Sequence, residues 1–112
     1  MSQLSASNCV PCHGNEPALT SEEVEHLRPE LPDWSLIEEE GVKRLERVFR
    51  FRNYRDAWAF TDKVAEAANE QDHHPLITLE WGKVTVQWWT HKIKGLHKND
   101  FIMAAKTDVL YG

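Results

Sequence analysis

Three histidines, His73, His74 and His91, are the residues of this chain whose type and spacing best fit chemistry. Histidine ordinarily titrates close to neutral pH, so neighbouring imidazoles can serve as a general acid and a general base. Imidazoles that were all protonated would repel one another, which favours a cluster that holds both forms. A single histidine is more often a surface or capping residue, so this interpretation requires that the fold bring the three together.

Zinc binding is the main alternative use of such a cluster. However, His73 and His74 are consecutive, and neighbouring side chains in extended backbone point to opposite faces. This arrangement suits contacts with two sides of a ligand better than the coordination of one metal ion. We therefore predict no metal site at these residues.

The spacing of the histidines around one predicted β-hairpin suggests that they do meet. Residues 76–81 and 84–90 have the pattern of two strands, and Gly82-Lys83 between them suits a type II′ turn, which favours glycine first. This turn would place His74 opposite His91 at the open end of the hairpin, with His73 beside them. It would also give the hairpin one apolar face, made of Ile77, Leu79, Trp81, Val84, Val86 and Trp88.

Two further residues are candidates for contact with a ligand at this end of the hairpin. Asp100 lies in the first turn of the predicted last helix, where the helix dipole favours a carboxylate. It could also orient a histidine or accept a hydrogen bond from the ligand. Trp89 lies on the histidine side of the hairpin, where an indole could cover a flat heterocycle.

The elements that position these residues follow from capping and periodicity. Thr20 and Glu23 form a capping-box signature for a helix over Ser21–Leu27, and a hairpin follows over residues 34–38 and 43–51, with its turn around 39–41. Asn53 is a suitable N-cap for an amphipathic helix that must end before Pro75. The second hairpin and a helix over about 98–110 complete the chain.

The element order α-β-β-α-β-β-α predicts a two-layer fold of the α+β class. One layer is a four-stranded antiparallel sheet, and the other consists of helices that cover one face of this sheet. Residues 19–112 would form a single domain, because a chain of 112 residues can bury one core but hardly two. Residues 1–18 show no periodicity and are predicted to be an extended, flexible N-terminal arm.

The bulk composition excludes several functions. The formal net charge is -5 and no basic cluster is evident, which argues against direct binding of nucleic acid. No apolar stretch approaches the roughly 20 residues that cross a bilayer, and no secretion signal is visible at the N-terminus. We therefore predict a cytoplasmic protein without a membrane partner.

The two cysteines lie in the predicted arm, in the sequence Cys9-Val10-Pro11-Cys12-His13. This string matches the attachment motif of c-type haem, but haem attachment generally requires export. A zinc site would need ligands beyond Cys9 and Cys12. Two reduced thiols are the simplest interpretation under cytosolic conditions, with metal binding or a regulatory disulfide as alternatives.

Several of these residues together resemble the signature of the pterin-4a-carbinolamine dehydratase family. His73-His74-Pro75, Trp81, His91 and Asp100 stand at the family's spacings, and the resemblance runs from about Thr20 to the C-terminus. The stretches 80–86 and 94–96 look like the bacterial enzymes that accompany phenylalanine hydroxylase. The first position of the signature, usually charged or His, is Asn69 here, and no role is carried over to it.

The resemblance implies a function. It implies the dehydration of 4a-hydroxytetrahydrobiopterin to quinonoid dihydropterin, with His73, His74 and His91 as acid–base residues and Asp100, Trp89 and Pro75 at the substrate. It implies no cofactor, because the pterin is itself the substrate, and a homodimer or homotetramer. The alternative is a protein-interaction or dimerisation module on the same fold, because a fold does not determine a function.

Overall fold

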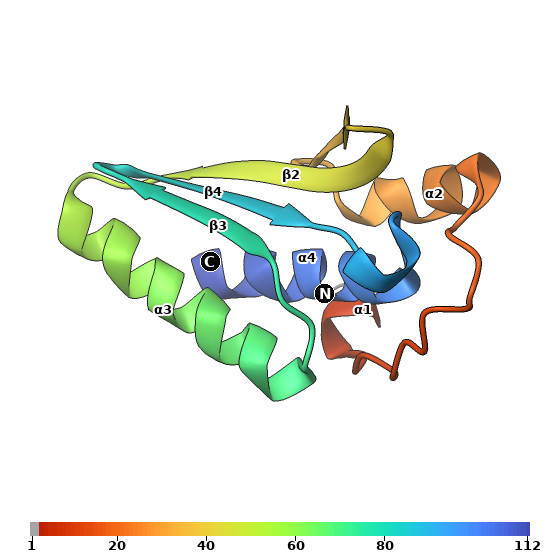
Figure 1. Cartoon of the computed structure of the whole chain (residues 1–112). Coiled ribbons are helices and arrows are strands. Elements are labelled where there is room, and N and C mark those ends of the chain that lie inside the picture. The colour runs from red at the N-terminus through yellow and green to blue at the C-terminus, as the bar shows by residue number, and fades with distance from the viewer. Residues whose placement is uncertain (1–2) are drawn as a thin grey trace.

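A four-stranded antiparallel sheet with helices packed on one face forms the body of the protein in the computed structural model, which describes residues 3–112 (Figure 1). The predicted α+β class is confirmed. The strands lie in the order β1-β2-β4-β3 and are β1 (Ser35–Glu39), β2 (Val42–Arg50), β3 (Leu76–Glu80) and β4 (Lys83–Trp88). The helices are α1 (Gln3–Ala6), α2 (Ser21–Leu27), α3 (Tyr54–Gln71) and α4 (Lys98–Tyr111), with 3-10 turns η1 (Arg28–Glu30) and η2 (His91–Ile93).

The helix starts follow the capping residues read from the sequence. Thr20 and Glu23 form the reciprocal capping box of α2, and the Asn53 side chain accepts a hydrogen bond of 2.7 Å from the backbone N–H of Asp56 at the start of α3. Asp72 caps the C-terminus of helix α3 and has the left-handed conformation with φ 51°. This ending turns the chain out of the helix just before His73.

The register of the second hairpin differs from the prediction by two residues. Glu80 pairs with Lys83 and Leu79 with Val84, so the turn is Trp81-Gly82 rather than Gly82-Lys83. Gly82 occupies the second central position of the turn with φ 69°, a conformation that glycine adopts without strain. Its carbonyl accepts a hydrogen bond of 2.9 Å from the N–H of Phe51, which ties the turn to the end of β2.

This displacement changes some predicted neighbours and preserves others. The predicted opposition of His74 and His91 was wrong, because the last pair of the ladder is Leu76 with Gln87. Trp81 was also misplaced, since it lies in the turn and is 73% exposed. A shift of two residues keeps every side chain on its face of the sheet. The other five residues of the predicted apolar face therefore still face the core, namely Ile77, Leu79, Val84, Val86 and Trp88.

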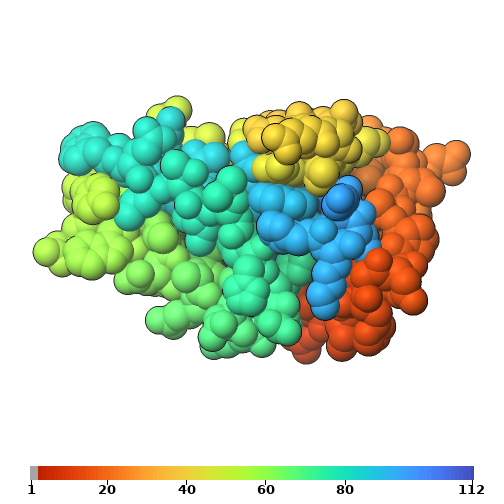
Figure 2. Space-filling model, in the orientation of Figure 1, coloured from red at the N-terminus to blue at the C-terminus, as the bar shows by residue number. Residues whose placement is uncertain are grey.

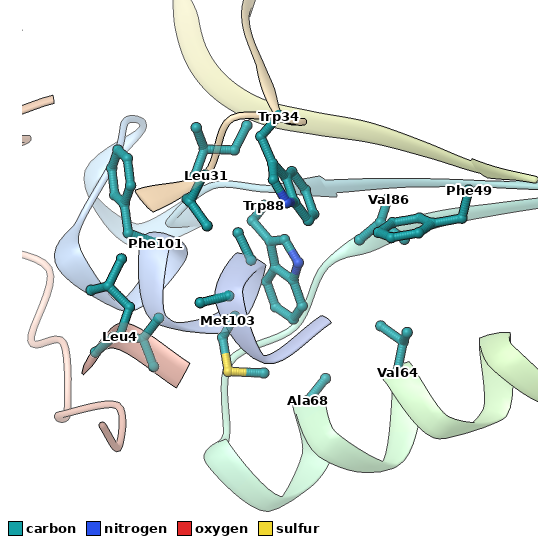
Figure 3. Packing of buried hydrophobic residues seen from close by; sticks show 14 of the residues in the cluster. Leu4, Leu31, Trp34, Phe49, Val64, Ala68, Val86, Trp88, Phe101 and Met103 are labelled. Carbon is teal, nitrogen blue, oxygen red and sulfur yellow. The ribbon is translucent and has the colours of Figure 1, made fainter. Parts of the chain in front are cut away.

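The core fills the space between the sheet and helices α3 and α4. Figure 3 shows Trp88 reaching from β4 toward α4, and its indole N–H donates a hydrogen bond of 3.2 Å to the hydroxyl of Thr107. Val64 and Ala68 of α3 face Val86 from below. The end of β4 is therefore fixed by buried packing just before the chain reaches His91. Across residues 3–112, no helix is both long and apolar enough to span a bilayer.

Part of the N-terminal arm is folded against the body of the protein. Residues 3–6 form helix α1, which lies against α4, and Leu4 is buried in the core with 3% exposure. Figure 3 shows Leu4 on the same side of the sheet as Met103. A single apolar residue in a four-residue helix leaves no periodic signal, so this contact could not be predicted from the sequence. Residues 1 and 2 of the expected arm lie outside the described residues.

Candidate active site

A cavity of about 400 Å³ opens at the end of the sheet where β3 begins and β4 ends. His73, His74 and His91 all line it. The other walls come from the N-terminal segment Cys9–Cys12, the last residues of α3, the turn after β4 and the start of α4. Segments that are far apart in the sequence therefore meet around one space of the size that small-molecule sites usually have.

The three histidines meet because the two segments that carry them lie at the same end of one hairpin. His73 and His74 precede β3, while His91 follows β4, and antiparallel neighbours place these two segments side by side. The slip in register did not separate them, since both segments lie beyond the last ladder pair. The predicted convergence is therefore observed, although the predicted pairing is not.

A buried carboxylate holds His73 in place. One oxygen of Asp100 lies 2.6 Å from Nε2 of His73, and the other accepts hydrogen bonds from the Thr90 hydroxyl at 2.8 Å and the His97 N–H at 2.9 Å. The Asp100 side chain is fully buried, and that of His73 is 10% exposed. A carboxylate accepts hydrogen bonds, so this contact assigns a proton to Nε2 and leaves Nδ1 as the free ring nitrogen of His73.

The ring of His73 is also fixed by stacking. It lies parallel to the Trp88 indole, with a centroid distance of 5.8 Å and an interplanar angle of 8°. Because Trp88 is completely buried, this contact joins the imidazole to the core. His73 is thus held on its face by packing and on its edge by Asp100, which is the preorganisation that acid–base catalysis requires.

The other two histidines are exposed to solvent at the mouth of the cavity. The His91 ring contacts that of Trp89, with centroids 4.4 Å apart, and the guanidinium of Arg44 covers the indole of Trp89 at 3.9 Å. This places a cation–π stack behind His91. His74 and His91 can therefore reach a ligand in the cavity without further opening of the fold.

The three residues expected at the substrate are sequence neighbours of residues that line the cavity. Among residues 3–112, the cavity lining includes none of Asp100, Trp89 and Pro75. Asp100 acts on His73, Trp89 packs against His91, and Pro75 joins His74 to β3. Direct contact of these residues with the substrate stays a prediction, while the structure shows Asp100 buried among its donors and Trp89 stacked against His91.

Sequence reasoning missed other residues of the cavity. The segment Cys9–Cys12 was assigned to a free arm, and Gln71 and Asn99 were not singled out, although all of them line the space. Their neighbours in sequence carried the only signal, since Asn99 precedes Asp100 and Gln71 lies two residues before His73. Polar residues at helix ends are too common for this adjacency to identify them.

The N-terminal thiols are free in the structure. Burial raises the pKa of the Cys9 thiol to about 11, and the carboxylate of Asp100 adds to this effect while Lys106 opposes it. Cys9 is thus a thiol rather than a reactive thiolate at neutral pH. In the part of the chain that the structure describes, no three His, Cys, Asp or Glu side chains are grouped so that they could hold a metal ion.

An α+β fold that gathers imidazoles in an open cavity and fixes one of them on a buried carboxylate is of a class that has the groups acid–base chemistry uses. Comparison with known proteins agrees with this class. The family model for pterin 4 alpha carbinolamine dehydratase matches residues 17–110, which include all three histidines and Asp100. The chain belongs to this family, whose members are hydro-lyases.

Two relatives that carry the family's name match nearly the whole chain. Those of Marinobacter nauticus and Photobacterium profundum, each named "Putative pterin-4-alpha-carbinolamine dehydratase", are both 55% identical to it. The first match covers 99% of this chain and 100% of the relative, and the second covers 96% of each.

Two solved structures share the fold. A transcriptional coactivator/pterin dehydratase from Brucella melitensis superposes with a TM-score of 0.76 at 28% identity, over 85% of this chain and 99% of that one. A pterin dehydratase-like RuBisCO assembly factor of the alpha-carboxysome has a TM-score of 0.61 at 23% identity, over 74% and 94%. At that identity the second likeness shows the fold alone.

Proposed function

We propose that this protein dehydrates 4a-hydroxytetrahydrobiopterin to quinonoid dihydrobiopterin by histidine acid–base catalysis. The observation that carries the proposal is the grouping of His73, His74 and His91 around one cavity, with His73 bound to the buried Asp100. Membership of the dehydratase family supports the reaction, and the cavity volume of about 400 Å³ can admit a bicyclic ring.

The reaction needs one proton donor and one proton acceptor. Hydroxide is a poor leaving group, so a protonated imidazole donates to the oxygen on carbon 4a as the carbon–oxygen bond breaks. A neutral imidazole removes the proton from ring nitrogen 5. The electron pair of the broken nitrogen–hydrogen bond then forms the new double bond between nitrogen 5 and carbon 4a, while water leaves. His73, His74 and His91 supply both groups in this proposal, and Asp100 orients His73. No cofactor takes part, because the pterin is the substrate.

The proposed product is the form that a reductase can return to tetrahydropterin. The protein would thereby support an aromatic amino-acid hydroxylase, which releases the carbinolamine. The similarity of residues 80–86 and 94–96 to bacterial enzymes that accompany phenylalanine hydroxylase supports this role. A cytoplasmic location stays a prediction from the sequence.

The activity can be tested by following the decay of 4a-hydroxytetrahydropterin in an absorbance assay. The wild-type protein is expected to accelerate this decay above the spontaneous rate in proportion to its concentration. Bovine serum albumin at the same concentration controls for nonspecific effects. If the decay is equally fast with and without the protein, the proposed enzymatic function is wrong.

The alternative is a protein-interaction module. The names of the Brucella coactivator and of the carboxysome assembly factor attach other roles to this fold, but these names describe those proteins. A scaffold has no need for imidazoles grouped in a cavity or for a buried carboxylate that fixes one of them. The site therefore favours catalysis.

We also propose that the protein forms a homodimer or homotetramer. Strands β1 and β3 are the two edges of the sheet, and such edges are commonly covered in assemblies. Large apolar side chains are exposed near β3 and on α3, namely Leu76 at 44%, Trp81 at 73% and Trp58 at 49%. Light scattering at micromolar concentration is expected to give a multiple of the 13.0 kDa chain mass. A monomeric mass would contradict this.

A further inference from the structure

The N-terminal segment Cys9–Cys12 is part of the cavity wall, although it lies more than 60 residues before the histidines in sequence. In Figure 2 the red N-terminal residues lie beside the blue residues that follow β4, at the same end of the molecule as the end of α3. Each residue from Cys9 to Cys12 lines the cavity. The segment thus closes a side of the space that the sheet and helices leave open.

The amide of Asn99 holds this segment at its centre. Its oxygen accepts a hydrogen bond of 3.0 Å from the N–H of Val10, and its nitrogen donates one of 2.7 Å to the carbonyl of Val10. Asn99 thereby satisfies both backbone groups of one residue, as a neighbouring strand would. Its side chain is buried, and the residue is 2% exposed. Loss of these bonds would leave a buried polar group unpaired, which is costly.

Two more side chains hold the segment on either side of Val10. The Gln71 side chain accepts a hydrogen bond of 2.7 Å from the Cys9 N–H and donates one of 3.2 Å to the side chain of Asn8. The ammonium of Lys92 donates a hydrogen bond of 3.0 Å to the carbonyl of Cys12. The anchors come from α4, the end of α3 and the turn after β4, so the wall is tied to three of the segments that border the cavity.

The wall also differs chemically from the side formed by the histidines. Val10 is 57% exposed, and Pro11 next to it is exposed and apolar. A flat heterocycle has two apolar faces and a polar edge, and apolar side chains pack well on such a face. The histidines supply proton transfer, and Val10 and Pro11 supply a surface on which a ring can rest.

We propose that the segment Cys9–Cys12 is a fixed wall of the pterin cavity, with Val10 and Pro11 packing on the ring and Asn99 as the positioning residue that holds them there. This inference rests on the proposed function and adds a binding role for the arm. A wall of this kind acts on substrate affinity, because it makes no contact that changes as the carbon–oxygen bond breaks.

The first test separates KM from kcat. Asn99→Ala is expected to raise KM about 10-fold and to change kcat less than about 2-fold. This is the result of losing an interaction that stabilises the bound substrate and the transition state equally. Val10→Ser removes the apolar surface without altering the anchors and is expected to raise KM by several-fold. The matched control is Asn15→Ala, which removes an exposed amide that lies outside the cavity lining, and it should behave as wild type.

Thiol labelling reports the position of the wall without any turnover. The Cys9 thiol is half-buried, and its pKa of about 11 slows its reaction with a thiol reagent at pH 8. Release of the segment in Asn99→Ala should expose Cys9 to water, lower its pKa toward the ordinary value of 9.0 and speed its labelling at least 10-fold. Val10→Ser should leave the labelling rate unchanged, because its anchors remain.

Binding of 7,8-dihydrobiopterin, which lacks the 4a-hydroxyl group, tests the wall independently of catalysis. Its dissociation constant should rise in parallel with KM in both variants, and saturating dihydrobiopterin should slow the labelling of Cys12 in wild type. The proposal is wrong if Asn99→Ala exposes Cys9 while affinity is unchanged, or if Cys9 labelling is unaltered by that substitution. A failed dehydratase activity would show instead as no acceleration by wild type, with binding and labelling still measurable.

Discussion

His74→Ala and His91→Ala are each expected to lower kcat by about 100-fold, which is the usual cost of losing one acid–base group. Both residues line the cavity, and both are exposed to solvent. The free energy of unfolding should therefore change by less than about 0.5 kcal/mol, as for ordinary surface substitutions. Steady-state kinetics on the carbinolamine, together with urea denaturation, measure the two effects separately.

The matched control is His26→Ala, because His26 is an exposed histidine in α2 that does not line the cavity. It should retain wild-type kcat and KM. Unchanged kcat in both His74→Ala and His91→Ala would remove these residues from the mechanism and leave His73 without an acid–base partner. A loss in only one of them would identify which imidazole works with His73.

The grouping of the three histidines was predicted correctly from the sequence, although the hairpin register used to predict it was wrong. A glycine suggests a turn, but Gly82 can occupy either central position, and the choice moves every cross-strand pair by two residues. The hydrogen bond between Phe51 and Gly82 depends on a neighbouring strand that hairpin rules do not include. The histidines still met, because their grouping depends on which end of the hairpin they occupy.

Local sequence signals predicted the ends of the helices well. Thr20 with Glu23 and Asn53 marked helix starts, and Pro75 marked the end of a helix, because these residues act on the backbone beside them. The arm shows the opposite case. Leu4 and Val10 are placed by α4 and Asn99, which are about 90 residues away along the chain, and no local pattern reports such contacts.

The ligand contacts of Asp100 and Trp89 stay predictions, and in the described part of the chain neither residue is among those that line the cavity. Asp100 and Trp89 were correctly associated with the histidines, but sequence could not distinguish a residue that touches a ligand from one that supports the residue that does. The difference depends on side-chain direction, and here both side chains face a histidine rather than the cavity. Support of this kind has measurable consequences, and they are largest for Asp100.

Asp100→Asn is expected to lower kcat by about 10-fold to 100-fold, although the amide occupies the same space as the carboxylate. The carboxylate accepts from three donors, on His73, Thr90 and His97. If the amide oxygen keeps Thr90 and His97, the NH₂ group faces His73 and requires Nε2 to accept. The proton of the neutral ring then moves to Nδ1, which inverts the tautomer that the wild-type site presents to the cavity. Nitrogen-15 NMR of the imidazoles would detect this change directly.

Asp108→Asn is the matched control for Asp100→Asn, because it alters another aspartate of α4 whose partners, Trp34 and Arg47, lie outside the cavity lining. Both substitutions should reduce stability by roughly 1 to 3 kcal/mol, since each disturbs hydrogen bonds to a carboxylate. Only Asp100→Asn should reduce kcat and alter the His73 resonances. Equal losses of activity in the two variants would mean that Asp100 acts through stability alone. A normal kcat in Asp100→Asn would show that the orientation of His73 by a carboxylate is not needed for the reaction.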